Sequence, residues 1–242
     1  MMRLNLTPTP ASALAIVAHP DDAEFQCGAT LAKWAAGGTS IHHLVLTDGS
    51  KGSWEVQEDT RALVATRRVE QRAAAKALGA TGEQVFLDNV DGELSCGLET
   101  QREVARVIRE LRPDVVLGHD PWRRWRLHPD HRNAGWLCTD GVVAARDPHF
   151  FPGVGGAHHR PSAILLFECE EPDLAEDVTG FVDTKVAALL EHRSQFVTTH
   201  HIDDASDTDQ VARFRRRIDD RLATNGARVG VRHAELFRLI VP

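Results

Sequence analysis

The sequence predicts an α/β fold in which helices flank a Rossmann-like, mainly parallel sheet. Two observations predict it. Short β-rich runs alternate along the chain with longer segments of helical pattern, which is typical of repeated βαβ units. The chain has 242 residues, of which 42% are hydrophobic, enough for one substantial core. We therefore expect a single domain over residues 1–242.

The short β-rich runs are the expected strands. They lie at residues 13–18, 41–47, 84–87, 114–118, 163–167 and 235–241. In an open α/β sheet, ligands bind outside the carboxyl ends of the strands, where loops lead into helices. Unusual polar segments follow the first four strands: His19–Asp22, Thr47–Gly49, Asp91–Gly92 and His119–His131. We expect the functional site at this edge of the sheet.

Glycine and proline mark the ends of the expected helices. One helix ends at Gly79, and another ends before Pro113, because the residue before a proline avoids the helical region. The Gly-, Pro- and His-rich stretch after Asp147 predicts a long surface loop. The expected helices are residues 24–36, 60–78, 98–111, 181–195 and 207–222.

Composition narrows the class of partner. The formal net charge of −7 does not favour binding to nucleic acid or to an anionic membrane. No run of about 18 apolar residues occurs. The first residues lack the basic leader and long apolar region of a signal peptide. We expect a cytoplasmic protein that acts on a small molecule, with its four scattered cysteines as buried free thiols.

Two turns rich in histidine and aspartate follow the first and fourth strands. The turn His19–Asp22 holds an imidazole and two carboxylates, and zinc accepts both kinds of ligand. The segment His128–His131 adds two imidazoles at the start of a helix. Either turn alone is as readily a helix cap or a polar loop. Two such turns at neighbouring sheet ends predict a metal centre.

Further motifs extend the pattern along the chain. They are Ala18-His19-Pro20-Asp21-Asp22, Thr47-Asp48-Gly49, Arg67-x-x-Glu70, His128-Pro129-Asp130-His131, Asp183-x-Lys185, His192-x-Ser194-Gln195 and Ala234-Glu235-x-Phe237. In these motifs the chain resembles the PIG-L or LmbE-like deacetylases over nearly its whole length. The resemblance implies a zinc-dependent hydrolase that removes an N-acetyl or other N-acyl group from an amino sugar or a glycoside.

The resemblance also implies roles for individual residues. His19, Asp22 and His131 would hold one zinc ion, which leaves a position for a water molecule whose pKa the zinc lowers to about 7. Asp21 would act as the general base toward that water, and His128 would face the substrate.

Four acidic or basic residues outside this set are further candidates. Asp130 is expected to accept a hydrogen bond from a metal-binding histidine. Arg67 resembles the family's substrate-contacting arginine, or is a helix-surface arginine paired with its helix neighbours. Asp48 and Asp91 bind substrate or cap their turns, and turn caps are favoured.

The chain departs from the family at one position before the second turn. Some members carry a tyrosine two residues before the His-Pro-Asp-His segment, whereas this chain has Arg126 there and contains no tyrosine. Three interpretations remain. Arg126 replaces the tyrosine as a cationic donor, or the aromatic and basic residues 122–126 form a wall around a sugar, or this loop is solvated.

Two other functions use the same turns. A metal-dependent phosphoesterase would have similar ligands, but usually assembles more carboxylates around two ions. A non-catalytic sugar-binding protein on this fold would need neither Asp21 nor His128. A dinucleotide site is disfavoured, because the first turn has no GxGxxG motif and its carboxylates would repel a pyrophosphate. The sequence does not specify an oligomeric state.

Overall fold

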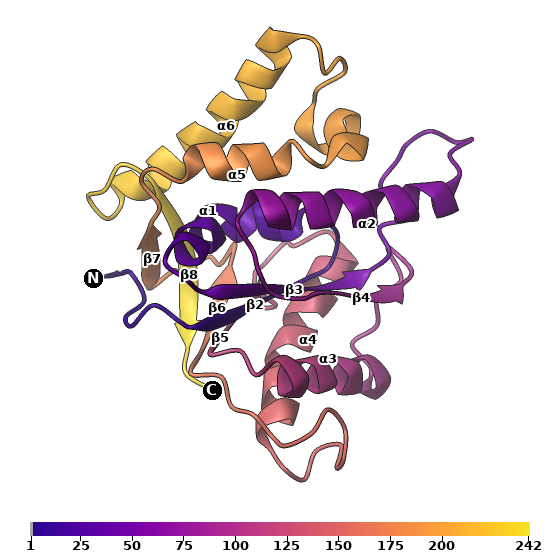
Figure 1. Cartoon of the computed structure of the whole chain (residues 1–242), viewed down its shortest axis with the longest axis vertical. Coiled ribbons are helices and arrows are strands. Elements are labelled where there is room, and N and C mark those ends of the chain that lie inside the picture. Colours follow the sequence, from indigo (N-terminus) through magenta and orange to yellow (C-terminus); the bar gives the residue numbers. More distant parts are fainter. Residues whose placement is uncertain (1) are drawn as a thin grey trace.

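A computed structural model describes residues 2–242 as a central sheet with helices on both faces (Figure 1). The strands are β1 Arg3–Leu4, β2 Ser12–Val17, β3 Ser40–Thr47, β4 Gln84–Asn89, β5 Val115–His119, β6 Ala163–Phe167, β7 Leu174–Asp177 and β8 Ala234–Ile240. The helices are α1 Asp22–Ala36, α2 Thr60–Ala77, α3 Leu98–Leu111, α4 Pro129–Arg146, α5 Val182–Leu189 and α6 Thr208–Ala227.

The sheet reverses its strand order at β2 and β5. The eight strands lie in the order β1-β7-β8-β6-β5-β2-β3-β4. All neighbours are parallel except for β8, which runs antiparallel to β6 and β7. From β2 the chain proceeds outward to β3 and β4, whereas from β5 it proceeds the other way to β6, so a crevice opens at their carboxyl ends. The predicted α/β fold with a mainly parallel sheet is confirmed.

Central strands are buried on both faces. On β2, Ala13, Ala15 and Val17 pack with α1, whereas Leu14 and Ile16 pack with α3 and α4. All five side chains are completely buried. Apolar contacts on both faces therefore fix the point at which the chain leaves β2 and enters the first histidine- and aspartate-rich turn. None of the helices in residues 2–242 has the length and apolar content needed to cross a membrane.

Two strands at the edge of the sheet are absent from the sequence prediction. β1 has only two residues, too few for a pattern. β7 contains Glu176 and Asp177, which break an apolar run. Glu176 is nevertheless buried, because its Oε2 accepts a hydrogen bond from Lys33 Nζ at 2.6 Å. Tertiary pairing rather than local preference forms these strands.

The helix expected over residues 181–195 is wrong in its second half. α5 ends at Leu189, and a 3-10 turn at Arg193–Gln195 and a π turn at Phe196–His200 follow. Glu70 on α2 supplies the reason. Its Oε1 accepts from the backbone N–H of Ser194 at 2.8 Å and its Oε2 from the hydroxyl of Ser194 at 2.6 Å, so that N–H is not available to a helical carbonyl.

The Gly-rich stretch after α4 is a loop, as predicted. The guanidinium of Arg109 on α3 holds it, with only 3% of the residue exposed. Arg109 donates to six backbone carbonyls between residues 144 and 154.

The four cysteines are free, but only Cys27 and Cys138 are buried. The prediction of burial is therefore wrong for Cys96, which is exposed, and for Cys169, which is half-buried.

Candidate active site

The two histidine- and aspartate-rich turns meet at the crevice between β2 and β5. His19 follows β2, and Asp22 is the first residue of α1. The backbone N–H of His19 donates to Oδ2 of Asp22 at 2.8 Å, which closes the first turn. His131 lies in the first turn of α4, which follows β5. The strand order therefore brings together side chains that are far apart in the sequence.

The donor atoms of His19, Asp22 and His131 converge. Nδ1 of His19 lies 3.1 Å from Nε2 of His131 and 3.3 Å from Oδ2 of Asp22. The same Nε2 of His131 lies 3.1 Å from Oδ1 of Asp22. Ligands bound at about 2.0 to 2.1 Å to a tetrahedral zinc ion stand about 3.3 Å apart. Asp22 turns one oxygen toward each histidine, and the spacing of the three side chains fits such an ion.

Carboxylates hold the other side of the His19 ring. Nε2 of His19 lies 3.1 Å from Oδ1 of Asp91 and 3.2 Å from Oδ2 of Asp130. Asp130 is itself fixed, because it accepts from the backbone N–H groups of Gly92 at 2.6 Å and Leu94 at 3.2 Å. A histidine that binds a metal through one nitrogen usually donates from the other to such a carboxylate. Asp130 therefore lies where an orienting residue would be expected.

Sequence reasoning did not single out His119 or Asp91 as part of the centre. His119 is buried, with Nε2 3.4 Å from Oδ2 of Asp22 and its ring stacked on that of His131 at 4.5 Å. Two sets of side chains besides the histidines 19, 128 and 131 could hold a metal ion: Asp22 with His119 and His131, and His19 with Asp91 and Asp130. His119 ends β5 and Asp91 lies two residues after β4, and this position at the carboxyl ends of strands is the signal that identifies them.

Asp21 is buried beside Arg67. Its backbone has a φ of 98°, a left-handed conformation that is uncommon for aspartate, and its N–H donates to Oε1 of Gln71 at 3.0 Å. Oδ2 of Asp21 lies 3.6 Å from Nη2 of Arg67. Burial raises the pKa of Asp21 to about 6, against the opposing effect of the Arg67 charge. Asp21 is thus a carboxylate of raised basicity next to the candidate metal ligands.

Arg67 faces the site, so the helix-surface interpretation is wrong. Only 3% of Arg67 is exposed. Its guanidinium donates to the carbonyls of Gly49 at 2.9 Å and Pro20 at 2.7 Å. Arg67 therefore ties α2 to the turns that follow β2 and β3 and lines the cavity above them.

A buried polar network lies behind Asp21. Gln71, which accepts from the backbone of Asp21, donates to Oε1 of Glu24 at 2.9 Å. The carboxylate of Glu24 faces two buried histidines, with Oε2 3.4 Å from Nε2 of His192 and Oε1 3.7 Å from Nε2 of His43. Sequence reasoning missed this network because its members come from α1, α2, β3 and the turn after α5.

His128 stands at the open side of the centre. It is exposed, and its ring centroid lies 4.7 Å from that of His19 and 4.8 Å from that of His131. It caps α4, because its Nδ1 accepts from the backbone N–H of Asp130 at 3.3 Å. Burial of part of the ring lowers the pKa of His128. A neutral ring that accepts at Nδ1 carries its proton on Nε2, from which it can donate.

Asp48 is a turn cap. Its Oδ1 accepts from the backbone N–H groups of Ser50 at 2.9 Å and Asp91 at 3.0 Å, which is the arrangement favoured from the sequence. Asp91 differs from that expectation. It is buried, and besides accepting from the N–H of Lys51 at 3.1 Å it contacts His19.

Arg126 lies at the edge of the centre and is held by Glu168. Nη2 of Arg126 is 2.5 Å from Oε2 of Glu168 and contacts Nδ1 of His131. Glu168 also pairs with Arg123 at 3.0 Å and lies 3.4 Å from Nδ1 of His119. The solvated interpretation of loop 122–126 is therefore wrong for Arg126, whereas Trp122, Arg124 and Trp125 are exposed. Glu168 was missed, although it follows β6 directly at the same edge of the sheet.

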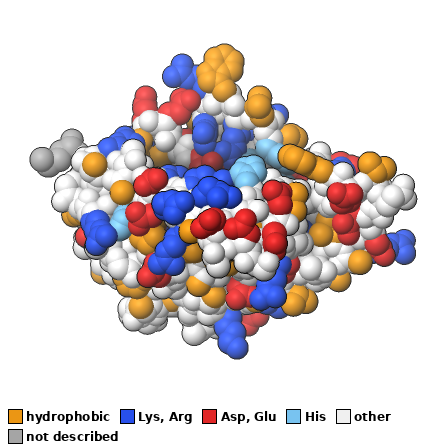
Figure 2. Space-filling view, turned by 90° about the horizontal axis from the view of Figure 1, so that it is seen from above, with side chains coloured by type: hydrophobic (Ala, Val, Ile, Leu, Met, Phe, Trp, Pro, Cys, Tyr) orange, Lys and Arg blue, Asp and Glu red, His pale blue; other side chains and the backbone are white. Residues whose placement is uncertain are grey.

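These side chains surround an open cavity of about 740 Å3. His19, Asp21, Asp22, Arg67, His128 and His131 line it. Trp54 and Trp125 also line the cavity, and 80% and 90% of their surfaces are exposed. Figure 2 shows a hollowed face of the molecule on which Lys, Arg and His side chains gather. A ligand bound at the candidate metal centre can therefore extend beyond it into the rest of the cavity.

Comparisons with known proteins agree with this geometry. The sequence model of the PIG-L family, described as GlcNAc-PI de-N-acetylase, matches residues 14–141. Diacetylchitobiose deacetylase of Thermococcus kodakarensis is 34% identical over 186 residues, covering 76% of this chain and 69% of that protein. The chain belongs to the PIG-L family. The matched range contains His19, Asp22, His128 and His131, so the PIG-L likeness and the candidate centre coincide.

A solved structure supports the same PIG-L fold over nearly the whole chain. N,N'-diacetylchitobiose deacetylase from Pyrococcus horikoshii superposes with a TM-score of 0.83 at 27% identity, covering 96% of this chain and 84% of that chain. Another relative is named for a different reaction, hydration. The 4-oxalmesaconate hydratase of Pseudomonas putida is 32% identical over 200 residues, covering 76% of this chain and 74% of that protein. A likeness to PIG-L proteins therefore does not by itself specify deacetylation.

Proposed function

We propose that this protein is a zinc-dependent hydrolase that removes an N-acetyl group from an amino sugar or a glycoside. The observation that carries the proposal is the convergence of His19, Asp22 and His131, with donor atoms 3.1 to 3.3 Å apart, at the floor of an open cavity. The description of the family and the names of the two diacetylchitobiose deacetylases support the substrate class.

His19, Asp22 and His131 would hold the ion. Zinc bound there would lower the pKa of a water molecule and polarise the amide carbonyl. The donor set of two imidazoles and one carboxylate is a combination found in catalytic zinc sites, which keep an open position. Asp91 and Asp130 keep the ring of His19 in place from the opposite side.

Asp21 is the general base of the proposed reaction. It accepts a proton from the attacking water as the oxygen adds to the amide carbonyl carbon, and it returns that proton to the departing amine nitrogen when the carbon–nitrogen bond breaks. Its support is its position next to Asp22 on the cavity wall, with the backbone held by Gln71 and the carboxylate beside Arg67. These contacts orient the carboxylate without consuming both of its oxygens.

His128 and Arg126 stabilise the negative charge that forms on the carbonyl oxygen. His128 donates from Nε2, because its Nδ1 accepts from the backbone of Asp130. Arg126 takes the place of the tyrosine found in some relatives, and Glu168 holds its guanidinium at the cavity wall. A guanidinium stays protonated throughout the cycle, so Arg126 can donate a hydrogen bond but cannot supply the proton that the amine needs.

The decisive test measures the zinc content of the purified protein and three activities: acetate release, phosphate release and hydration. The same measurements are made on wild type and on each variant. Zinc-loaded protein should release acetate from N-acetylated amino sugars and glycosides. Asp21→Asn should keep stoichiometric zinc while its kcat falls about 100-fold or more. His131→Ala should lose the zinc. Asp48→Asn is the control and should act like wild type, because an amide oxygen can still accept the two backbone N–H groups of that turn.

Other outcomes would replace the proposal. Phosphate release from phosphate esters would identify a phosphoesterase. Hydration of an unsaturated tricarboxylate such as 4-oxalmesaconate, without acetate release, would group the protein with its hydratase relative. Failure to bind zinc at any stoichiometry would refute the proposed zinc site. Binding of a sugar without turnover of any substrate would indicate a sugar-binding protein.

A further inference from the structure

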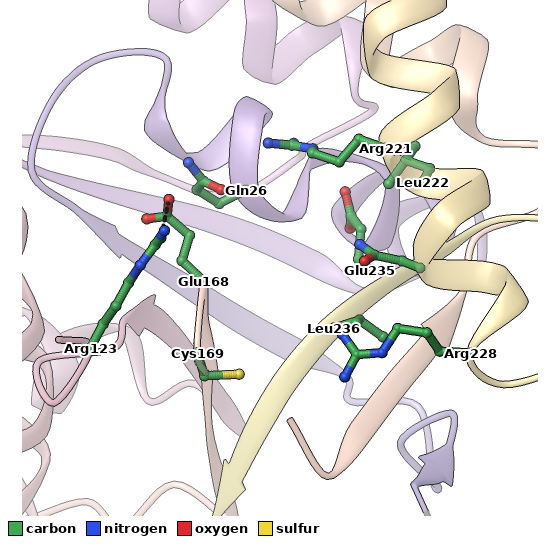
Figure 3. Close-up of a pocket in the computed structure, with 10 residues that line it drawn as sticks. Gln26, Arg123, Glu168, Cys169, Arg221, Leu222, Arg228, Glu235 and Leu236 are labelled. Carbon is green, nitrogen blue, oxygen red and sulfur yellow. Dashed lines mark hydrogen bonds and ion pairs between the residues drawn. The ribbon is translucent and has the colours of Figure 1, made fainter. Parts of the chain in front are cut away.

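A second cavity of about 280 Å3 adjoins the candidate active site (Figure 3). Its wall comes from α1, the end of α6, β8 and the segments that follow β5 and β6. Three residues line both cavities: Gln26, Arg123 and Glu168. A ligand held in the second cavity therefore lies next to whatever occupies the first.

Two arginines of this second cavity have no acidic partner among the described residues 2–242. Arg221 lies on α6, and Arg228 is the residue at its C-terminal cap. In Figure 3 both side chains extend from α6 along the cavity. Within residues 2–242, neither guanidinium lies within 4 Å of a carboxylate oxygen, in contrast to nine other arginine–carboxylate pairs. Arg221 donates to the carbonyl of Phe25, which leaves its other N–H groups available.

The two carboxylates in the wall are already neutralised. Glu168 pairs with Arg126 at 2.5 Å and with Arg123 at 3.0 Å. Glu235 pairs with the buried Nζ of Lys185 at 2.5 Å and accepts two backbone N–H groups of α1. Three cationic side chains line the cavity, Arg123, Arg221 and Arg228, and two more, Arg126 and Lys185, pair with its two carboxylates. This excess of positive charge stands out in a chain whose net charge is −7.

We propose that the second cavity is an anion subsite that binds a phosphate or carboxylate group through Arg221 and Arg228. A guanidinium offers parallel N–H groups that match two oxygens of such an anion. The side-chain amides of Gln26 and Asn225 line the same space and add neutral donors. The anion is either part of the substrate, whose sugar then lies in the larger cavity, or a separate small molecule.

Direct binding tests the subsite without using catalysis. Inorganic phosphate is titrated calorimetrically into metal-free and zinc-loaded protein in a low-salt buffer. Wild type should bind phosphate in both forms, and Arg228→Gln and Arg221→Gln should each weaken binding about ten-fold or more. Arg216→Gln is the matched control, since Arg216 is exposed on the same helix and lines neither cavity. Absence of binding, or equal binding by all four proteins, would overturn the proposal.

A matched pair of substrates distinguishes the two sources of the anion. This arm rests on the proposed function. It compares kcat/KM for N-acetylglucosaminides with a neutral or a phosphorylated aglycone. If the substrate carries the anion, Arg228→Gln lowers kcat/KM about ten-fold for the charged substrate and leaves the neutral one unchanged. Phosphate binding without such discrimination identifies a separate anion. Inactivity toward both substrates would count against the deacetylase, while the binding data still decide the subsite.

Discussion

Replacement of Lys185 by methionine should destabilise the protein while the candidate centre stays chemically intact. Lys185 on α5 is completely buried. Its Nζ donates to Oε1 of Glu235 at 2.5 Å and to the carbonyl of Phe25 at 2.8 Å. This pair joins two of the motifs that resemble the family, Asp183-x-Lys185 and Ala234-Glu235-x-Phe237, and links α5, β8 and α1.

The magnitude follows from the charge that Lys185→Met leaves behind. Removal of one partner of a buried ion pair costs about 3 to 5 kcal/mol, because the other charge loses its compensation. Glu235 would keep two donors, the backbone N–H groups of Ala29 at 3.1 Å and Thr30 at 2.7 Å. We therefore expect a loss near the lower end, about 3 kcal/mol in the free energy of unfolding.

Urea unfolding followed by circular dichroism gives this free energy. The double variant Lys185→Met/Glu235→Gln should recover most of the loss, because no unpaired charge stays buried. Asp183→Asn is the control: it lies two residues earlier, is exposed, and pairs with exposed Arg215, so it should cost less than about 1 kcal/mol. A loss for Lys185→Met no larger than that of the control, or a double variant as unstable as the single one, would show that the charge of Lys185 does not compensate Glu235.

Three further predictions concern the loop, the pH dependence and the metal. Arg109→Met should lower the free energy of unfolding by about 3 kcal/mol or more, because the backbone carbonyls that Arg109 binds lose their donor. Unchanged amide hydrogen exchange in residues 148–162 would contradict this. Burial lowers the pKa of His200 to about 4, so its contribution to stability falls as the pH drops from about 6.5 towards 4. Between about pH 7 and pH 5 the free energy of unfolding should therefore fall by about 2 kcal/mol more for wild type than for His200→Phe. If this free energy depends on pH in the same way for both proteins, His200 does not have a lowered pKa. A Cβ at Gly135 would lie 2.8 Å from the backbone oxygen of His119. Gly135→Ala should therefore shift α4 together with His131 and weaken zinc binding. An unchanged zinc affinity would contradict this, because it would mean that the added methyl group does not displace His131.

The helices and central strands were predictable because neighbouring residues encode them. Helix α2 ends within one residue of its predicted limit, since Gly79 adopts a φ of 81° that most residues avoid. The two histidine- and aspartate-rich turns were predictable for a related reason. They follow strands, and the carboxyl ends of parallel strands meet at one edge of a sheet.

The partners of these turns were not predictable from local pattern. Arg67 has the same helical neighbours whether it faces solvent or Asp21, and only the packing of α2 against the first turn buries it. Glu168 reads as one acidic residue in an acidic stretch until β6 pairs with β5 and places it beside His119 and Arg126. Side-chain contacts of this kind depend on strand order, which no short segment specifies.

The sequence by itself determined the fold class, the edge of the sheet that carries the site and the residue types available for a metal. Short-range periodicity and turn chemistry act over a few residues and are written in them. Only the tertiary structure decided which atoms converge. The 3.1 Å approach of His19 to His131, the orientation of Arg126 by Glu168 and the placement of Arg221 and Arg228 in one cavity with Gln26 all bring together segments that are distant in the chain. Their positions follow from the burial of both sheet faces, a property of the whole chain.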